Sequence, residues 1–333
     1  MRWQILIFFL LVWEFRPIVS AICTLYPAGS LFQEQFHTYS SNGLLDVRLI
    51  FQRDITDDGN VEYCFLTQDG VRSPVLHVNP GDELRITLTN AVSGGGAPAT
   101  NMHFHGFHVS PASGQDEVVV TQVQPDGGVF TYSIAVPATH FPGVYWYHTH
   151  VHMAAEESVL GGASGMIVVE GLEATVPDLA GMPVRTLTLR DNLVPGLEEM
   201  HDTRGPSWDL SVNFVPVPYP DYPPVRAVLP PSAVELWRVV NACADSLLDL
   251  QLQYDGVPQD VRLVAMDGAP GTNAALQSIL LPNGARAEFV VRGPDLSVRT
   301  ARLVTLPIDA GPVGDRNPLR PLLSLIPTHG AAP

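Results

Sequence analysis

An internal repeat limits the architectures that this 333-residue chain can adopt. Residues 80–91 are echoed at residues 230–242, and the Asn-Ala pairs that close the two copies lie 151 residues apart. This spacing is the length of one domain. Two tandem copies of one unit are therefore the simplest organisation of the chain. Gly, Pro, Glu and Asp cluster in residues 171–183, which predicts the boundary there.

Short apolar or alternating runs in both copies predict β-strands. Residues 83–89 read Glu-Leu-Arg-Ile-Thr-Leu-Thr, which has the period of two expected of a half-buried strand. Because Gly- and Pro-rich turns separate the runs, we expect residues 40–172 and 183–325 each to fold as an antiparallel β-sandwich. The other runs are residues 44–51, 130–136, 143–148, 166–170, 186–189, 236–240, 278–281, 288–291 and 301–306.

The N-terminus has the pattern of a secretory signal peptide. Nine apolar residues, Ile5 to Trp13, precede Val19-Ser20-Ala21, which is small at the two positions that a signal peptidase reads. Nine residues of helix rise about 14 Å, which is too short to span a bilayer, so a membrane anchor is disfavoured. We expect residues 1–21 to be removed after Ala21 and the mature chain to be secreted or periplasmic.

The charge and cysteine content exclude several classes of function. The chain has 18 basic residues, all of them Arg, against 34 acidic ones, for a net charge of −16. An acidic chain without a basic cluster is not expected to bind nucleic acid or an anionic membrane. Cys23, Cys64 and Cys243 allow one disulfide and leave one thiol over, and the sequence leaves their pairing open.

Two His-x-His motifs carry the strongest functional signal. His103 and His105 form one, and His148 and His150 form the other, 45 residues later; both lie in apolar, aromatic segments. On a strand, residues i and i+2 face the same side, so two such pairs on neighbouring strands place four imidazoles around one small volume. Burying several imidazoles without a partner is unfavourable. We therefore interpret the four residues as ligands of a metal such as copper or zinc.

The remaining histidines receive lesser roles. His152 continues the predicted face of His148 and His150, and His108 follows the first motif, so both are expected behind the ligands or at the rim of the site. Surface or packing roles are predicted for the histidines that stand alone in the sequence, which are His37, His77, His140, His201 and His329.

The surroundings of the two motifs resemble the multicopper oxidase family, which includes laccases and copper-efflux oxidases. The resemblance rests on Asn-Met-His-Phe-His-Gly at residues 101–106 and on Gly-Val-Tyr-Trp-Tyr-His-Thr-His at residues 143–150. It covers about residues 40–310. It implies two tandem cupredoxin-like (plastocyanin-like) Greek-key β-sandwich domains. Residues 22–175 would be the copper-binding first domain, and residues 176–333 a second domain without copper ligands.

The same resemblance implies copper and oxygen chemistry. In this family, a type 1 copper takes single electrons from a reducing substrate, and a cluster of type 2 and type 3 coppers reduces O₂ to water. By resemblance, His103 would bind the type 2 copper, and His105, His148 and His150 would bind the type 3 pair. The cluster uses eight histidines in the family, so these four residues make a type 2/type 3 half-site.

The chain also departs from the family pattern. The later His-x-x-His-x-His and His-Cys-His motifs are absent, and Cys243 has no histidine within forty residues on either side. Where the second repeat should match His103 and His105, near residue 254, it reads Gln251-Leu252-Gln253-Tyr254. The printed sequence therefore supplies no type 1 copper site, and no catalytic residue is assigned.

Three hypotheses follow from this mixture of match and departure. In the first, the chain is the first two domains of a three-domain oxidase, shortened by a gene model, splicing or mutation, and inactive alone. In the second, it is an exported scaffold or copper-binding protein of the same fold. In the third, it is a two-domain oxidase that shares copper sites across a trimer, which the second domain without ligands disfavours. The reducing substrate stays open, because its pocket is built around the type 1 copper.

Overall fold

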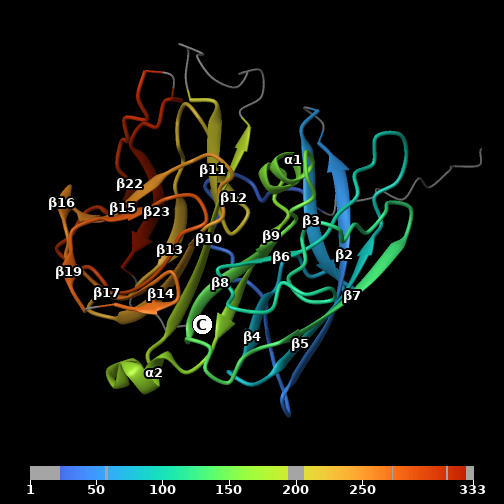
Figure 1. Ribbon diagram of the computed structural model, residues 1–333. Coiled ribbons are helices and arrows are strands. Elements are labelled where there is room, and N and C mark those ends of the chain that lie inside the picture. Colours follow the sequence, from blue (N-terminus) through green and yellow to red (C-terminus); the bar gives the residue numbers. More distant parts are fainter. Residues whose placement is uncertain (1–22, 57–58, 194–205, 272, 313, 328–333) are drawn as a thin grey trace, which may run out of the picture.

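The computed structural model of the chain describes residues 23–56, 59–193, 206–271, 273–312 and 314–327, which form two adjacent β-sandwiches (Figure 1). Four sheets make up the two sandwiches, and only short helices connect them. The predicted all-β architecture is confirmed. The predicted signal peptide lies outside the described residues. Among the described residues, no helix has the length and apolar character needed to cross a membrane.

The first sandwich packs a four-stranded sheet, in the order β3-β2-β5-β7, against a five-stranded sheet, in the order β1-β4-β9-β8-β6. In β5, Leu84, Ile86 and Leu88 point into the core and alternate with half-buried residues, as the period of two predicts. The strands are β1 (His37–Tyr39), β2 (Leu44–Ile55), β3 (Val61–Thr67), β4 (Val75–Val78), β5 (Glu83–Asn90), β6 (His103–His105), β7 (Gly128–Ala135), β8 (Gly143–His148) and β9 (Ser164–Val169).

The second sandwich has its own core, which runs from Leu187 to Leu325. One sheet has the order β12-β11-β10-β14-β21-β17-β18, with β19 on β17, and the other has the order β13-β23-β22-β15-β16, with β20 on β15. The strands are β10 (Val184–Leu193), β11 (Trp208–Val212), β12 (Val215–Val217), β13 (Val225–Val228), β14 (Val234–Asn241), β15 (Leu248–Tyr254), β16 (Val257–Pro258), β17 (Val261–Met266), β18 (Ala269–Pro270), β19 (Ala275–Leu276), β20 (Ile279–Leu281), β21 (Arg286–Arg292), β22 (Ala301–Thr305) and β23 (Arg320–Ile326).

The sequence repeat corresponds to a repeat of structure. Strand β5 lies between a parallel partner, β2, and an antiparallel partner, β7, and β14 lies in the same way between β10 and β21. Asn90 ends β5 and Asn241 ends β14, and each accepts the backbone N–H of the residue two positions on, at 3.1 Å. Helix α2 (Leu172–Thr175) and a 3₁₀ turn (Pro177–Leu179) connect the copies. The domain limits of 22–175 and 176–333 stay predictions.

The expected β-sandwiches are present, but their sheets are not antiparallel throughout. Five strand pairs are parallel, namely β1 with β4, β4 with β9, β2 with β5, β10 with β14, and β13 with β23. Between β2 and β5 the chain passes through β4 of the facing sheet, so that β5 returns beside β2 in the same direction. Such crossovers depend on how strands are connected between sheets, which strand periodicity alone does not report.

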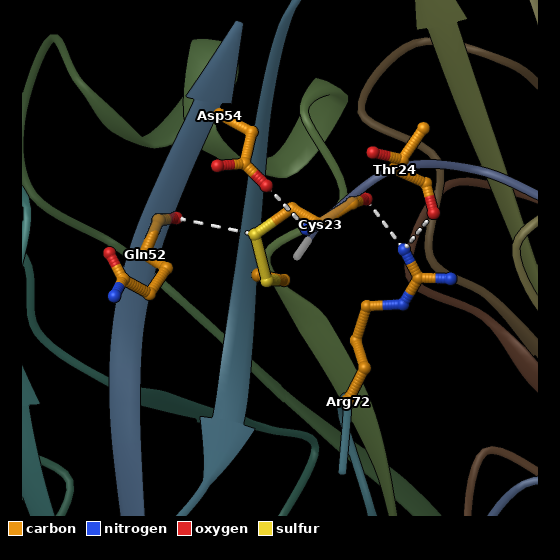
Figure 2. The surroundings of a disulfide bond; sticks show 6 residues. Cys23, Thr24, Gln52, Asp54 and Arg72 are labelled. Carbon is orange, nitrogen blue, oxygen red and sulfur yellow. Dashed lines mark hydrogen bonds between the residues drawn. A yellow bond between two sulfur atoms is a disulfide. The ribbon is translucent and has the colours of Figure 1, made fainter. Parts of the chain in front are cut away.

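The N-terminal segment joins the two sandwiches. Cys23 and Cys64 form a disulfide with a Cα–Cα distance of 5.5 Å, which settles the pairing that the sequence left open, and Cys243 is a buried free thiol. Figure 2 shows Asp54, which accepts the Cys23 N–H at 2.6 Å, and Arg72, which donates to the carbonyls of Cys23 and Thr24. Residues 26–32 then lie along the second sandwich, where the Phe32 N–H donates to the Arg226 carbonyl at 2.8 Å.

The two sandwiches meet through β8. Its partners across the domain boundary are β14 and β21. Val144 and Trp146 of β8 pack with Val240 and Ala242 of the second sandwich, whereas Tyr145 and Tyr147 face the first core. Alternate residues of β8 point to opposite faces of the sheet, and each face packs against a different domain. Every residue of β8 is consequently buried.

Two histidines that stand alone in the sequence form a hydrogen-bonded chain near this boundary. His77 is 3% exposed, its Nδ1 lies 2.6 Å from Glu170 Oε1, and its Nε2 lies 2.7 Å from His37 Nδ1. Arg238 of the second sandwich lies 3.8 Å from Glu170 Oε2 and pairs with Glu288 at 2.9 Å. The packing role predicted for His37 and His77 therefore includes a polar link between the domains.

The disulfide generates the first prediction. It closes a loop between residues separated by 41 positions, and the chain-entropy relation gives a stabilisation of about 4 kcal/mol for a loop of that size. We expect Cys23→Ala/Cys64→Ala to lower the free energy of unfolding by roughly that amount, measured by urea denaturation. The unfolded wild type should show one free thiol by titration. Three free thiols, or an unchanged midpoint in the double variant, would contradict the assignment.

The second prediction concerns acid stability. Burial, and then the neighbouring His77, lowers the pKa of His37 to about 4, whereas an unfolded histidine titrates near 6.5. Between these values the unfolded state binds more protons, so stability is full above about pH 6.5 and falls as the pH drops toward 4. In urea denaturation at several pH values, His37→Gln should lose less stability over this window than the wild type does. Identical slopes would contradict the role of His37.

Candidate metal centre

Strand pairing brings the two histidine motifs together. Strands β6 and β8 are antiparallel neighbours, with His103 opposite His148 and His105 opposite Trp146. One ring nitrogen from each of His103, His105 and His148 lies within 4.8 Å of the others. The two motifs thus meet on neighbouring strands as predicted, except that His150 lies beyond the end of β8. On β8, His148 has the parity of Val144 and Trp146, so the cluster lies on the sheet face that the second domain covers.

Two of the rings are held by their Nδ1 atoms. His103 Nδ1 lies 2.9 Å from Asp116 Oδ1, which also accepts the Phe104 N–H at 3.0 Å. His148 Nδ1 donates to the Thr149 carbonyl at 2.7 Å. When Nδ1 carries the proton, Nε2 keeps the lone pair that a metal ion binds.

The electrostatics of the cluster fit a metal. Burial lowers the pKa of His148 well below its usual value, and burial followed by the nearby His103 lowers the pKa of His105 to about 4. Both rings are therefore neutral near pH 7, which is the form that ligates metal ions. The Nε2 atom of His148 is buried and has no hydrogen-bond partner. A buried lone pair without a donor is what an ion at this position would satisfy, so these residues fit a copper ion.

An indole ring supports the cluster from the side. Trp146 stacks on His148 with ring centroids 4.2 Å apart and on His105 with centroids 4.9 Å apart. Its Nε1 donates to the carbonyl of Gly284, in the second domain, at 3.2 Å. The rings of two candidate ligands are thus fixed by a residue that is itself held across the domain boundary.

His150 lies beside the cluster but beyond the strand. The expectation of one face shared by His148, His150 and His152 is wrong, because β8 ends at His148 and the chain then leads into helix α1 (Ala155–Leu160). The His150 N–H donates to Asn101 Oδ1 at 2.7 Å, and its exposed ring has its centroid 5.2 Å from that of His103. His152 is exposed and lines a surface hollow with His150. The ligand role of His150 stays a prediction.

The other histidines have separate positions. The exposed His108 donates its backbone N–H to His140 Nε2 at 3.0 Å. His140 is buried between Phe107 and Tyr145, which agrees with the packing role predicted for it. His201 and His329 lie outside the described residues.

Among its described residues, the second domain carries no histidine on the sheet face that bears the ligands of the first. In β6, His103 and His105 lie on the face away from the first core, whereas Phe104 points into it. In β15, which has the corresponding place beside β22, Leu250 and Leu252 point into the second core, so Gln251 and Gln253 lie on the other face. The stretch expected to match the histidines, Gln251 to Tyr254, contains both glutamines. In the described part of the chain, the metal-type histidine cluster occurs only in the first domain.

Several residues of the site escaped the sequence analysis. Asp116 lies in a loop without periodicity, and Asn101 was read only as part of a motif. Asn101 also donates to the carbonyls of Val118 and Thr121, so it connects the loop to the chain at His150. Gly284 is distant in sequence and belongs to the other domain. Spacing around the histidines gave no signal for these contacts.

Comparisons with known proteins agree with this geometry. The multicopper oxidase family profile matches residues 51–174. The iron transport multicopper oxidase FET3 of Saccharomyces cerevisiae is 29% identical over 149 residues, which is 44% of this chain and 22% of that protein. A laccase of Cryphonectria parasitica is 32% identical over 108 residues, which is 31% of this chain and 17% of the laccase.

Solved structures share the fold. A variant of the multicopper oxidase McoA from Aquifex aeolicus has a TM-score of 0.74 at 18% identity, covering 90% of this chain and 65% of the oxidase. A metallo-oxidase from Campylobacter jejuni has a TM-score of 0.68 at 19% identity, covering 93% and 65%. The chain thus matches about a fifth of the length of the curated relatives and just under two thirds of the solved ones. Residues 51–174 thus match the multicopper oxidase family, and the fold of the described chain is similar to that of solved multicopper oxidases.

Proposed function

We propose that this chain binds copper through His103, His105, His148 and His150, as the first-domain half of a multicopper oxidase cluster. The observation that carries the proposal is the buried, unpartnered Nε2 of His148, which belongs to a group of three imidazoles whose ring nitrogens lie within 4.8 Å of one another. In the role pattern of the family, His103 would serve the type 2 ion and the other three the type 3 pair. Bound copper would supply one-electron redox chemistry and a binding site for O₂.

The chain's own residues set the form of the ligands. Asp116 keeps the His103 proton on Nδ1, and the Thr149 carbonyl does the same for His148. Trp146 excludes water from one side of two rings by stacking on them. These contacts orient lone pairs toward one volume before any ion arrives, which favours binding.

The proposed oxidase activity needs ligands from outside the described residues. Strand β6 is at the edge of its sheet, so one side of the cluster has no neighbouring strand. Beside it, Val119 is 82% exposed and Met153 is 91% exposed, and both line the hollow that contains His150 and His152. We propose that a further cupredoxin domain, from more of the same protein or from another chain, covers this face and supplies the remaining histidines and the type 1 copper. O₂ and a reducing substrate would be the reactants, as in the family.

Export is part of the same proposal. The Cys23–Cys64 disulfide begins two residues after the predicted cleavage site at Ala21, and disulfides persist in oxidising compartments. A secreted or periplasmic location would also place the protein where it meets O₂ and extracellular or periplasmic substrates.

The third prediction concerns copper binding. Titration calorimetry should show weak, substoichiometric Cu²⁺ binding by the wild type, because only half of the cluster ligands are present. His148→Ala should weaken the affinity at least about tenfold, as loss of a ligand exceeds the usual effect of losing its supporting contact. His152→Ala, which changes a histidine in the same hollow but outside the cluster, should bind as the wild type does. Absence of copper binding in the wild type would favour the scaffold hypothesis, and three tight sites would overturn the half-site.

The fourth prediction concerns activity. The purified chain should not oxidise phenols or aromatic amines with reduction of O₂ to water, because the described residues offer no cysteine–histidine site for electron entry. The copper-loaded protein should lack the blue colour of a copper–thiolate bond. Any O₂ consumption should appear as hydrogen peroxide, which an oxygen electrode detects when catalase returns part of the O₂. A blue protein that consumes O₂ without releasing peroxide would contradict this prediction.

A further inference from the structure

We infer that the second domain, although it lacks copper ligands, positions the ligands of the first through the turn at Gly284. The inference rests on the proposed function, because it concerns the same histidines. Gly284 belongs to the turn Pro282-Asn283-Gly284 between β20 and β21, and its backbone lies against the ring of His105. The turn thereby forms one wall of the candidate metal centre.

Gly284 leaves no room for a side chain. Its φ is +78°, and a Cβ atom placed there would lie 2.6 Å from Cε1 and 2.7 Å from Nε2 of His105. Contacts that short do not occur between a Cβ and a ring, so a methyl group at this position would force the imidazole to move. The bare backbone of the second domain therefore limits how the His105 ring can tilt.

The same residue acts on the cluster by a second route. The Gly284 carbonyl accepts the Trp146 Nε1–H at 3.2 Å and a hydrogen bond from Arg286 Nη1 at 3.3 Å. Trp146 stacks on both His105 and His148. One turn of the second domain thus contacts one ligand directly and orients the indole that supports two.

Other glycines at the boundary between the two domains also allow close contact, and they lie in both domains. In the first domain, Gly106 directly follows His105, and a Cβ there would overlap the guanidinium of Arg286, at 2.8 Å from its Cζ. Arg286 Nε also donates to the Val144 carbonyl of β8 at 3.1 Å. In the second domain, a Cβ at Gly268 would lie 2.6 Å from Cζ of Tyr145. Glycines on both sides thus let backbone and side chains of one domain meet those of the other behind the histidines.

The two domains therefore contribute different parts of the candidate site. The first domain provides the ligands, and the second fixes ring orientation through its contacts with His105 and Trp146. Metal sites depend on such supporting contacts, and losing one weakens affinity by about 10- to 100-fold. Gly284 and Trp146 are positioning residues in this sense, and neither is assigned as a ligand.

The test compares Gly284→Ala with Gly256→Ala in the full chain. Gly256 has a φ of +79°, so alanine is placed in the same left-handed region in both variants, but a Cβ at Gly256 meets nothing within 4 Å and only Gly284→Ala presses on His105. We expect Gly284→Ala to weaken Cu²⁺ binding by about tenfold or more and to shift the His105 imidazole ¹⁵N resonances in the metal-free protein. Gly256→Ala should change neither readout. Equal behaviour of the two variants in both readouts would overturn the inference.

The metal-free readout separates this inference from the proposed function. If the wild type binds no Cu²⁺, the copper proposal fails, and a His105 shift specific to Gly284→Ala would still support the positioning contact. Should Gly284→Ala fail to fold, Trp146→Phe removes the hydrogen bond to the Gly284 carbonyl while keeping an aromatic ring. That variant should move the His105 and His148 resonances, and unchanged resonances would overturn the inference.

Discussion

The register between β6 and β8 is the constraint on which the site depends. His103 faces His148 across this pair, and a slip of one residue would turn one set of imidazoles toward the first core. The register is held on both faces of β8, because Tyr145 and Tyr147 pack in the first core while Val144 and Trp146 pack against the second domain. A strand between two cores cannot slip without disrupting both. The fold therefore fixes the cluster through packing that has no chemical role of its own.

The sequence predicted the features that follow from the spacing of residues within one strand. It did not predict the features that depend on how distant strands and loops are connected. Strand β5 and the paired motifs of β6 and β8 were expected, because alternation and His-x-His spacing record the side of a strand that each residue occupies. The parallel pairing of β2 with β5 was not expected, since it follows from a crossover through the facing sheet. The same limit explains the error at His152, where the two-residue period was extended past the end of the strand.

Contacts that distant segments make with the histidines could not be predicted from the motifs. Asp116 reaches His103 from a loop, and Gly284 reaches His105 from another domain, 179 positions away along the chain. The role of Gly284 is to leave room for the His105 ring, and this role can be recognised only when the neighbours of the glycine are known. The histidines could thus be identified from the sequence, whereas the groups that orient their rings required the fold.

The second domain illustrates how a copy without a histidine cluster can support a neighbouring copy that has one. Strand β6 carries His103 and His105 on the face away from its core, whereas β15 carries Gln251 and Gln253 on the corresponding face. The turn of the second domain at Gly284 instead closes the neighbouring site from one side, with a carbonyl that holds Trp146 and a backbone that limits His105. At the edge strand β6, no further strand of the described structure flanks the cluster. The contacts with the second domain therefore set how the existing imidazole rings point. The open edge of β6 is where further ligands would have to enter for the cluster to be complete.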